Sequence, residues 1–173
     1  MTILAIDVHY PETGSTTAGV AFDAWDAATP THTYTSTRAV AMEYKPGQFY
    51  ERELPCILDL LQQHALKPDL IMVDGYVFLD GTTRPGLGKY LFDALGGAIP
   101  VVGVAKTAFA GIGEPFQLLR GDSSKPLFIT SAGIALDVAK AHVLSMDGKF
   151  RLPTLLKLAD QLCRQDNKKP ASL

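Results

Sequence analysis

The amino-acid sequence predicts an α/β fold in which three antiparallel strands come first and parallel strands, flanked by helices, follow. Three short segments with the character of strands, the first apolar and the next two β-branched and aromatic, occupy the first forty residues and are joined by short connections. Beyond residue 48 the apolar residues recur at helical spacing, and helical segments then alternate with short apolar runs. Apolar runs without polar alternation are typical of parallel strands that helices cover on both faces.

The predicted elements follow one another closely along the chain. The strands are expected at residues 3–8, 17–25, 31–40, 69–73, 100–105 and 127–130. The helices are expected at residues 48–65, 86–95, 136–146 and 154–165. Strand, strand, strand, helix, strand, helix, strand is the order of a ribonuclease H-like mixed sheet, in which the fourth strand lies beside the first.

The length of the chain favours a single domain. Its 173 residues, 47% of them hydrophobic, are enough for one substantial core and too few for two. We therefore expect one domain over residues 1–165 and a flexible tail at 166–173. Cys56 and Cys163 lack the spacing of metal ligands and are expected to be buried thiols in a reducing compartment.

The composition also bounds the location and the partners. No run has the character of a signal peptide or a membrane span, so we expect a soluble, cytoplasmic and monomeric protein. The net charge of −2 excludes a large basic field. Binding of nucleic acid would therefore depend on locally placed cations or on metal ions.

Two aspartates occupy equivalent positions in the predicted sheet. Asp7 follows the apolar residues 3–6, and Asp74 follows the apolar residues 70–73. If the two strands are parallel neighbours, both carboxylates lie at the carboxyl edge of the sheet, where open α/β sheets bind ligands. A divalent cation would relieve their repulsion. An aspartate before Gly75 is also common in simple turns, so the pattern alone leaves two interpretations open.

The run from Tyr44 to Pro55 (YKPGQFYERELP) resembles the Tyr-x-Pro-Gly … Arg-Glu-x-Pro segment of the endonuclease V family. This resemblance implies a wedge that fills the gap left by an extruded base, and a metal-binding glutamate. The wedge residues are Tyr44, Pro46 and Gly47, the metal ligand is Glu53, and the neighbouring substrate contacts are Phe49 and Arg52.

Four further segments, in the same order as in that family, strengthen the resemblance. They are AIDV at 5–8, LIMVDG at 70–75, GVAK at 103–106, and RLP at 151–153 followed by LAD at 158–160. The resemblance implies that the metal ligands are Asp7, Glu53, Asp74 and Asp160, and that the catalytic residues are Asp7, Glu53, Asp74 and Lys106. Lys106 would contact the substrate phosphate, and Gly75 would let the backbone approach a flipped base.

The implied activity is hydrolysis of a phosphodiester bond 3′ to a deaminated purine, such as inosine, in DNA or RNA. Hard oxygen ligands, with no cysteine or histidine cluster nearby, favour Mg²⁺ or Mn²⁺. Such an ion lowers the pKa of bound water and clamps the reacting oxygens.

The chain departs from the family's pattern beside the expected base pocket. The family has Val-Asp-Gly-His-Gly where this chain has Tyr76 and Val77, with Asp80 shortly after, and it has Gly-His-Arg where this chain has residues 133–135 (GIA). Two alternatives therefore stay open: another nuclease on the same scaffold, and a non-catalytic or otherwise specialised ribonuclease H-like protein that binds nucleic acid.

Overall fold

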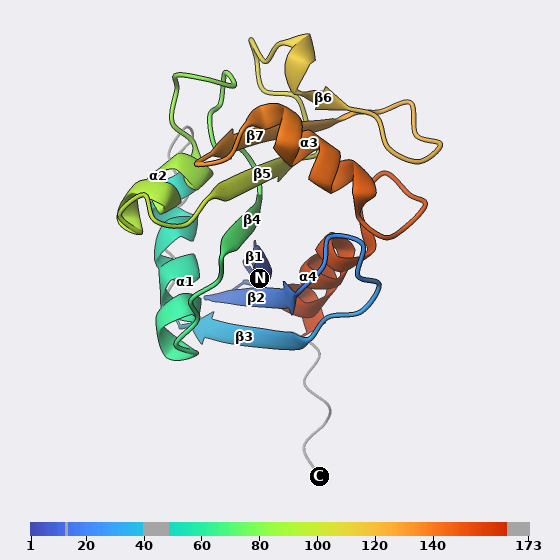
Figure 1. Cartoon of the computed structure of the whole chain (residues 1–173). Helices are drawn as coiled ribbons and strands as arrows, with labels where there is room; N and C mark the ends of the chain where they lie inside the picture. The colour runs from blue at the N-terminus through green and yellow to red at the C-terminus, as the bar shows by residue number, and fades with distance from the viewer. Residues whose placement is uncertain (13, 40–48, 166–173) are drawn as a thin grey trace.

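The computed structural model describes residues 1–12, 14–39 and 49–165, and the predicted tail at 166–173 lies outside them. Within the described residues, seven strands form one sheet in the order β3-β2-β1-β4-β5-β7-β6 (Figure 1). The strands are β1 (Ile3–His9), β2 (Ser15–Phe22), β3 (His32–Arg38), β4 (Leu70–Asp74), β5 (Val101–Ala105), β6 (Gln117–Leu118) and β7 (Leu127–Ala132). The helices are α1 (Phe49–Gln63), α2 (Leu87–Ala94), α3 (Leu136–Ser145), α4 (Thr154–Gln165) and the 3₁₀ helix η1 (Glu114–Phe116).

The first three strands form the predicted antiparallel meander, with β1 paired to β2 and β2 paired to β3. The second strand ends at Phe22, three residues earlier than predicted. Trp25 was included in that strand because aromatic residues favour strands. In the structure it lies beyond the strand end, and its ring stacks on His142 with centroids 4.4 Å apart. The Trp25 side chain therefore packs against α3 and is not part of the strand that the sequence pattern predicted.

The central prediction about topology is confirmed, because β4 lies parallel to β1 with Ile6 opposite Val73. β5 then pairs parallel to β4. β7, in contrast, runs antiparallel to β5. Residues 106–126 between them contain only η1 and the short β6, neither predicted from the sequence. Parallel neighbours are usually joined by a crossover helix that packs on one face of the sheet. Residues 106–126 contain no such helix, and β7 runs antiparallel to β5.

The helices cover the two faces of the sheet in pairs. α1 and α2 pack on the face that carries Leu4, Ile6 and Ile71. α3 and α4 pack on the face that carries Ile3, Ala5 and the alternate residues of the neighbouring strands. Both cysteines are buried and free, as predicted. No helix among the described residues is both long and apolar enough to cross a bilayer.

A buried arginine that the sequence analysis did not single out fixes the end of α3. Arg120 is 3% exposed. Its guanidinium donates hydrogen bonds to the carbonyl oxygens of Val143, Met146, Asp147 and Phe150. Because the last carbonyls of a helix lack partners within the helix, these bonds satisfy the end of α3 and hold the loop that leads into α4.

Candidate nuclease site

Side-chain alternation along the strands brings three predicted site residues to one face of the sheet. Ile3 and Ala5 point toward α4, so Asp7, two residues further along β1, continues on that face. The same alternation in β4 places Asp74 there, after Leu70 and Met72. Because β1 and β4 are parallel neighbours, both carboxylates lie at the carboxyl edge of the sheet.

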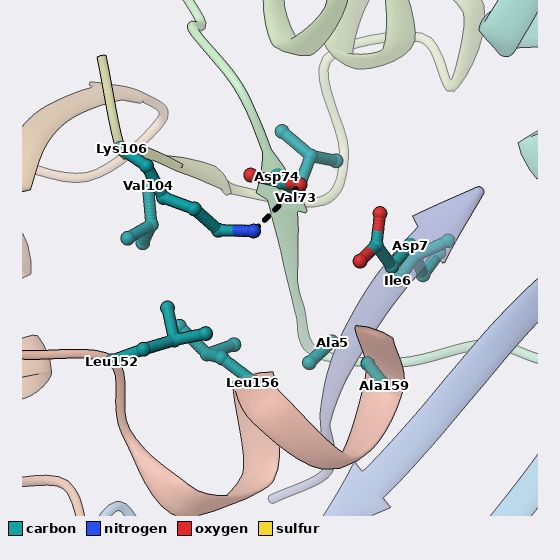
Figure 2. Close-up of a pocket in the computed structure, with 10 residues that line it drawn as sticks. All are labelled: Ala5, Ile6, Asp7, Val73, Asp74, Val104, Lys106, Leu152, Leu156 and Ala159. Carbon is teal, nitrogen blue, oxygen red and sulfur yellow. Dashed lines mark hydrogen bonds and ion pairs between the residues drawn. The ribbon is translucent and has the colours of Figure 1, made fainter. Parts of the chain in front are cut away.

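Lys106 joins these carboxylates from the end of β5. Its Nζ atom lies 3.4 Å from Oδ2 of Asp74. A small open pocket lies between the three side chains and α4. Figure 2 shows Asp7, Asp74 and Lys106 directed into this space above Leu156 and Ala159 of α4. The pocket therefore has a charged rim and an apolar floor.

Asp160 reaches the same place from α4. Three atoms lie within 4.8 Å of one another: a carboxylate oxygen of Asp7, a carboxylate oxygen of Asp160 and Sγ of Cys163. Asp160 accepts a hydrogen bond from Nε of Arg164 at 3.0 Å. The sequence analysis expected no cysteine or histidine cluster near the site, and one cysteine lies there: the thiol of Cys163 donates to the carbonyl oxygen of Asp160 at 3.1 Å. One helical turn separates Asp160 from Arg164, which explains how α4 supplies both the acid and its cation.

Glu53 approaches from α1, on the other face of the sheet, and is 7% exposed. Burial raises its pKa well above the ordinary value, and the negative charges of Asp7 and Asp74 raise it further. The neighbouring Arg52 opposes this shift. The guanidinium of Arg52 stacks on the ring of Tyr10, with its central carbon 3.5 Å from the ring centre. This cation therefore lies near the carboxyl of Glu53.

Burial disfavours the ionisation of Asp7 as it does that of Glu53. Burial raises the pKa of Asp7 to about 7, and the charge of Asp74 adds to the increase. Lys106 and the backbone N–H of Val8 act in the opposite direction but are outweighed. A buried carboxylate group of this kind is stabilised when a cation joins it.

The donor set fits a hard divalent cation. Asp7, Asp74, Asp160 and Glu53 offer carboxylate oxygens, which Mg²⁺ and Mn²⁺ prefer. Burial raises the pKa of the Cys163 thiol to about 12, and the charges of Asp7 and Asp160 contribute to that increase. In the metal-free protein a thiol with this pKa stays protonated at neutral pH, so forming the thiolate that softer metals favour costs free energy.

The raised pKa of Asp7 predicts how pH changes the stability of the metal-free protein. A carboxyl whose folded-state pKa exceeds its ordinary value of 3.8 stabilises the fold while it is protonated. That contribution is lost as the pH rises from about 4 through about 7. We therefore expect Asp7→Asn to melt above the wild type at pH 8 in chelating buffer, with the difference vanishing near pH 4. Thermal melts across this range measure it, and an equal difference at every pH would contradict it.

Gly75 leaves an opening directly above the end of β4. Its φ of +141° suits glycine, and a Cβ atom built there would meet no described atom within 4 Å. The turn rests closely on β5, because a Cβ atom on Gly103 would lie 2.6 Å from the carbonyl oxygen of Gly75. No described atom close to that point blocks a base from the backbone at Gly75, and the approach itself stays a prediction.

The three residues that depart from the family's pattern are all tied into the fold. The Tyr76 hydroxyl donates to the carbonyl oxygen of Thr107 at 2.6 Å and accepts from the backbone N–H of Phe109 at 3.0 Å. Val77 is fully buried. Asp80 accepts hydrogen bonds from the backbone of residues 82–84, which lower its pKa. These side chains shape the loops around the opening.

Tyr76→Phe tests the connection between the two loops. The variant keeps the ring but leaves the carbonyl of Thr107 and the N–H of Phe109 without the hydroxyl, so we expect the free energy of unfolding to fall by about 1 kcal/mol. Urea denaturation measures this change. Tyr34→Phe on β3, where the ring packs beside His32 and His64, is the matched control, and an equal loss in both variants would show that the connection contributes nothing.

Several predicted residues lie beyond what the structure describes. Tyr44, Pro46 and Gly47, the expected wedge, fall within residues 40–48. Phe49 begins α1, but its side chain is not described. The wedge therefore stays a prediction from the sequence.

The sequence analysis gave no role at the site to three further residues: Cys163, expected only as a buried thiol, Arg164, and Arg151, quoted only as part of the segment at 151–153. Cys163 and Arg164 follow Asp160 at helical spacing, a signal that would have found them once the helix was oriented. Arg151 donates from Nη1 to the carbonyl oxygen of Lys106 at 3.2 Å, a contact across 45 residues that no local pattern indicates.

Comparisons with known proteins show which family and which solved structures this chain is similar to. The family profile described as Endonuclease V matches residues 1–161. An endonuclease V of Streptomyces avermitilis is 33% identical over 154 residues, which cover 76% of this chain and 65% of that protein. The crystal structure of endonuclease V from the same organism superposes with a TM-score of 0.76 at 28% identity, covering 97% of this chain and 82% of that one.

A more distant structure shares the fold. It is endonuclease V of Ciona intestinalis in complex with a 24mer DNA containing an inosine followed by a ribo-adenosine. The TM-score is 0.80 at 18% identity, and the superposition covers 96% of this chain and 86% of that one. These neighbours confirm the ribonuclease H-like fold predicted from the order of the elements.

Proposed function

Because this chain belongs to the endonuclease V family, we propose that it is a metal-dependent endonuclease that hydrolyses a phosphodiester bond 3′ to a deaminated purine such as inosine. The observation that carries the proposal is the acidic pocket. Asp7 and Asp74 meet Lys106 at the sheet edge, and burial together with Asp74 raises the pKa of Asp7 to about 7. A buried carboxyl whose ionisation is disfavoured beside a second carboxylate is typical of a cation site.

In this proposal Asp7, Asp74, Asp160 and Glu53 hold Mg²⁺ or Mn²⁺. When bound there, such an ion would supply an activated water and would neutralise charge on the reacting phosphate. Lys106 donates a hydrogen bond from Nζ to a phosphate oxygen, and its ion pair with Asp74 at 3.4 Å orients it before the substrate arrives. Leu152 and Leu156 form the apolar floor and exclude bulk water from the charged groups above them.

The substrate class follows from the family and from the opening at Gly75. A relative from Ciona intestinalis has been crystallised with inosine-containing DNA. Extruding a base from a duplex costs a few kcal/mol, and least where the base is already unpaired. The net charge of −2 gives this chain little general attraction for phosphates. We therefore propose that it prefers inosine in single strands or loops over inosine in a perfect duplex.

The experiment compares three labelled DNA substrates and their RNA counterparts: inosine in a single strand, inosine in a duplex, and a single strand without inosine. With Mg²⁺ or Mn²⁺ we expect cleavage on the 3′ side of inosine, fastest in the single strand, and no cleavage in EDTA. Equal cutting of all three substrates would indicate a nuclease without lesion specificity. No cutting with either metal would favour a non-catalytic protein that binds nucleic acid.

A further inference from the structure

An exposed aromatic ring flanked by two cations lies on the loop between α3 and α4. Phe150 is 63% exposed. The Nζ atoms of Lys149 and Lys157 lie 5.6 Å and 5.8 Å from the centre of its ring. Both distances are within the range of cation–π attraction. An exposed apolar ring with two ammonium groups near it is a surface suited to a flat, electron-rich and negatively charged ligand.

The ring stands on a rigid support. The carbonyl oxygen of Phe150 accepts a hydrogen bond of 2.6 Å from Nη1 of the buried Arg120. Gly121 packs against the same loop so closely that a Cβ atom there would lie 2.3 Å from the carbonyl oxygen of Lys149. Because the backbone on both sides of the ring is fixed, a ligand that stacks on Phe150 pays little for ordering the loop.

The surface is continuous with the candidate catalytic pocket. Arg151, the next residue, donates to the carbonyl oxygen of Lys106, and Leu152 lines the pocket itself (Figure 2). On its other side the loop borders a groove lined by Asp122, Ser123 and residues 149–151. The carboxylate of Asp122 disfavours phosphate on that wall of the groove. A nucleic-acid strand that leaves the pocket therefore finds the positive charges that attract its phosphates at Lys149 and Lys157, away from Asp122.

We propose that Phe150, Lys149 and Lys157 form a platform for the nucleic-acid strand that extends out of the catalytic pocket. An unpaired base stacks on the ring, and the two ammonium groups bind the phosphates on either side of it. Stacking on an aromatic side chain accepts any base, and it needs a base that is not already paired. The platform thus gives a near-neutral protein a local means of holding single strands next to the site. It rests on the proposed function, because nucleic acid is the ligand there.

Binding measured without cleavage tests the platform. Fluorescence anisotropy with a labelled single-stranded DNA 20-mer carrying one inosine, in EDTA, gives the dissociation constant of the whole chain. Phe150→Ala is expected to weaken binding about tenfold, the loss of one base stacked on an aromatic side chain, without changing the salt dependence. Lys149→Ala combined with Lys157→Ala is expected to lower the slope of log K against log salt by about 1.4.

Matched controls separate the platform from general effects of truncation. Val138→Ala removes part of an apolar side chain that is 42% exposed on α3, and Lys67→Ala removes an exposed cation at the opposite edge of the sheet. Both should bind like the wild type. Equal binding by Phe150→Ala and Val138→Ala would overturn the platform. An absence of measurable binding of the DNA 20-mer by the wild type would also overturn it. A labelled oligoglutamate that binds as tightly as the DNA, and loses that binding in Phe150→Ala, would overturn it as well.

The outcomes distinguish the platform from the proposed nuclease activity. If Phe150→Ala binds about tenfold more weakly and the wild type never cuts inosine strands, the platform stands and the nuclease proposal fails. If the wild type cuts inosine strands and Phe150→Ala binds and cuts like Val138→Ala, the platform fails and the nuclease proposal stands.

Discussion

Asp7→Asn is expected to lower the rate of cleavage beside inosine by at least about a hundredfold, because loss of residues that only support a metal ligand already costs about 10–100-fold. Asp7 lies where the other acidic groups meet: Asp74 raises its pKa, and one of its oxygens lies within 4.8 Å of a ligand atom of Asp160. Asparagine keeps the shape and removes the charge that a cation needs. Single-turnover cleavage at saturating Mg²⁺ gives the rate constant.

The matched control is Asp93→Asn on α2. Asp93 is exposed and pairs with Lys89 at 2.5 Å, so its replacement removes a surface ion pair with little effect on stability or activity. Raising the Mg²⁺ concentration should not restore the Asp7→Asn variant to the wild-type rate. A rate within a few-fold of the wild type would remove Asp7 from the catalytic machinery.

Glu53→Gln is expected to combine two opposite effects. Cleavage should fall by at least about a hundredfold, because removing a residue that only supports a metal ligand already costs about 10–100-fold. The metal-free protein should melt at a temperature higher by about 3 °C at pH 8, which corresponds to about 1 kcal/mol for a chain of this size. Both effects have one cause, because Glu53 is 7% exposed and its charge is opposed by burial, Asp7 and Asp74. Differential scanning calorimetry with and without Mg²⁺ measures the shift.

Glu51→Gln, two residues earlier in α1, is the control for this helix. Glu51 is only partly buried and accepts a hydrogen bond from the hydroxyl of Tyr50, away from the acidic pocket. It should change neither the melting temperature nor the cleavage rate by a measurable amount. A Glu53→Gln variant that melts below the wild type in metal-free buffer would show that the ionised carboxylate stabilises the fold, contrary to our interpretation.

The fold could be predicted where local pattern and topology agree. Apolar runs such as residues 70–73 are buried on both faces, and the helical crossover through α1 places β4 beside β1. The direction of β7 could not be predicted, because it depends on an irregular link, residues 106–126, whose course has no periodic signal. The same link carries Arg120, whose four carbonyl partners lie 23 to 30 residues further along the chain.

The site could be predicted in its acidic part and less well in its surroundings. Strand alternation and the sheet edge are enough to bring Asp7 and Asp74 together, and the family resemblance indicated Glu53, Lys106 and Asp160. The environment of Cys163 depends on how α4 is rotated, which its sequence leaves open. The hydrogen bonds of the Tyr76 hydroxyl depend on a loop 31 residues away. Such long-range contacts set the shape of the opening and cannot be read from local spacing.

The most direct test of the central claim is the anomalous difference density of a crystal soaked in Mn²⁺. Our account predicts one or more manganese peaks bound by the carboxylate oxygens of Asp7, with ligands from among Asp74, Asp160 and Glu53, and no such peak in the Asp7→Asn variant. An ordered site with all four carboxylates present and no manganese bound to any of them would contradict it.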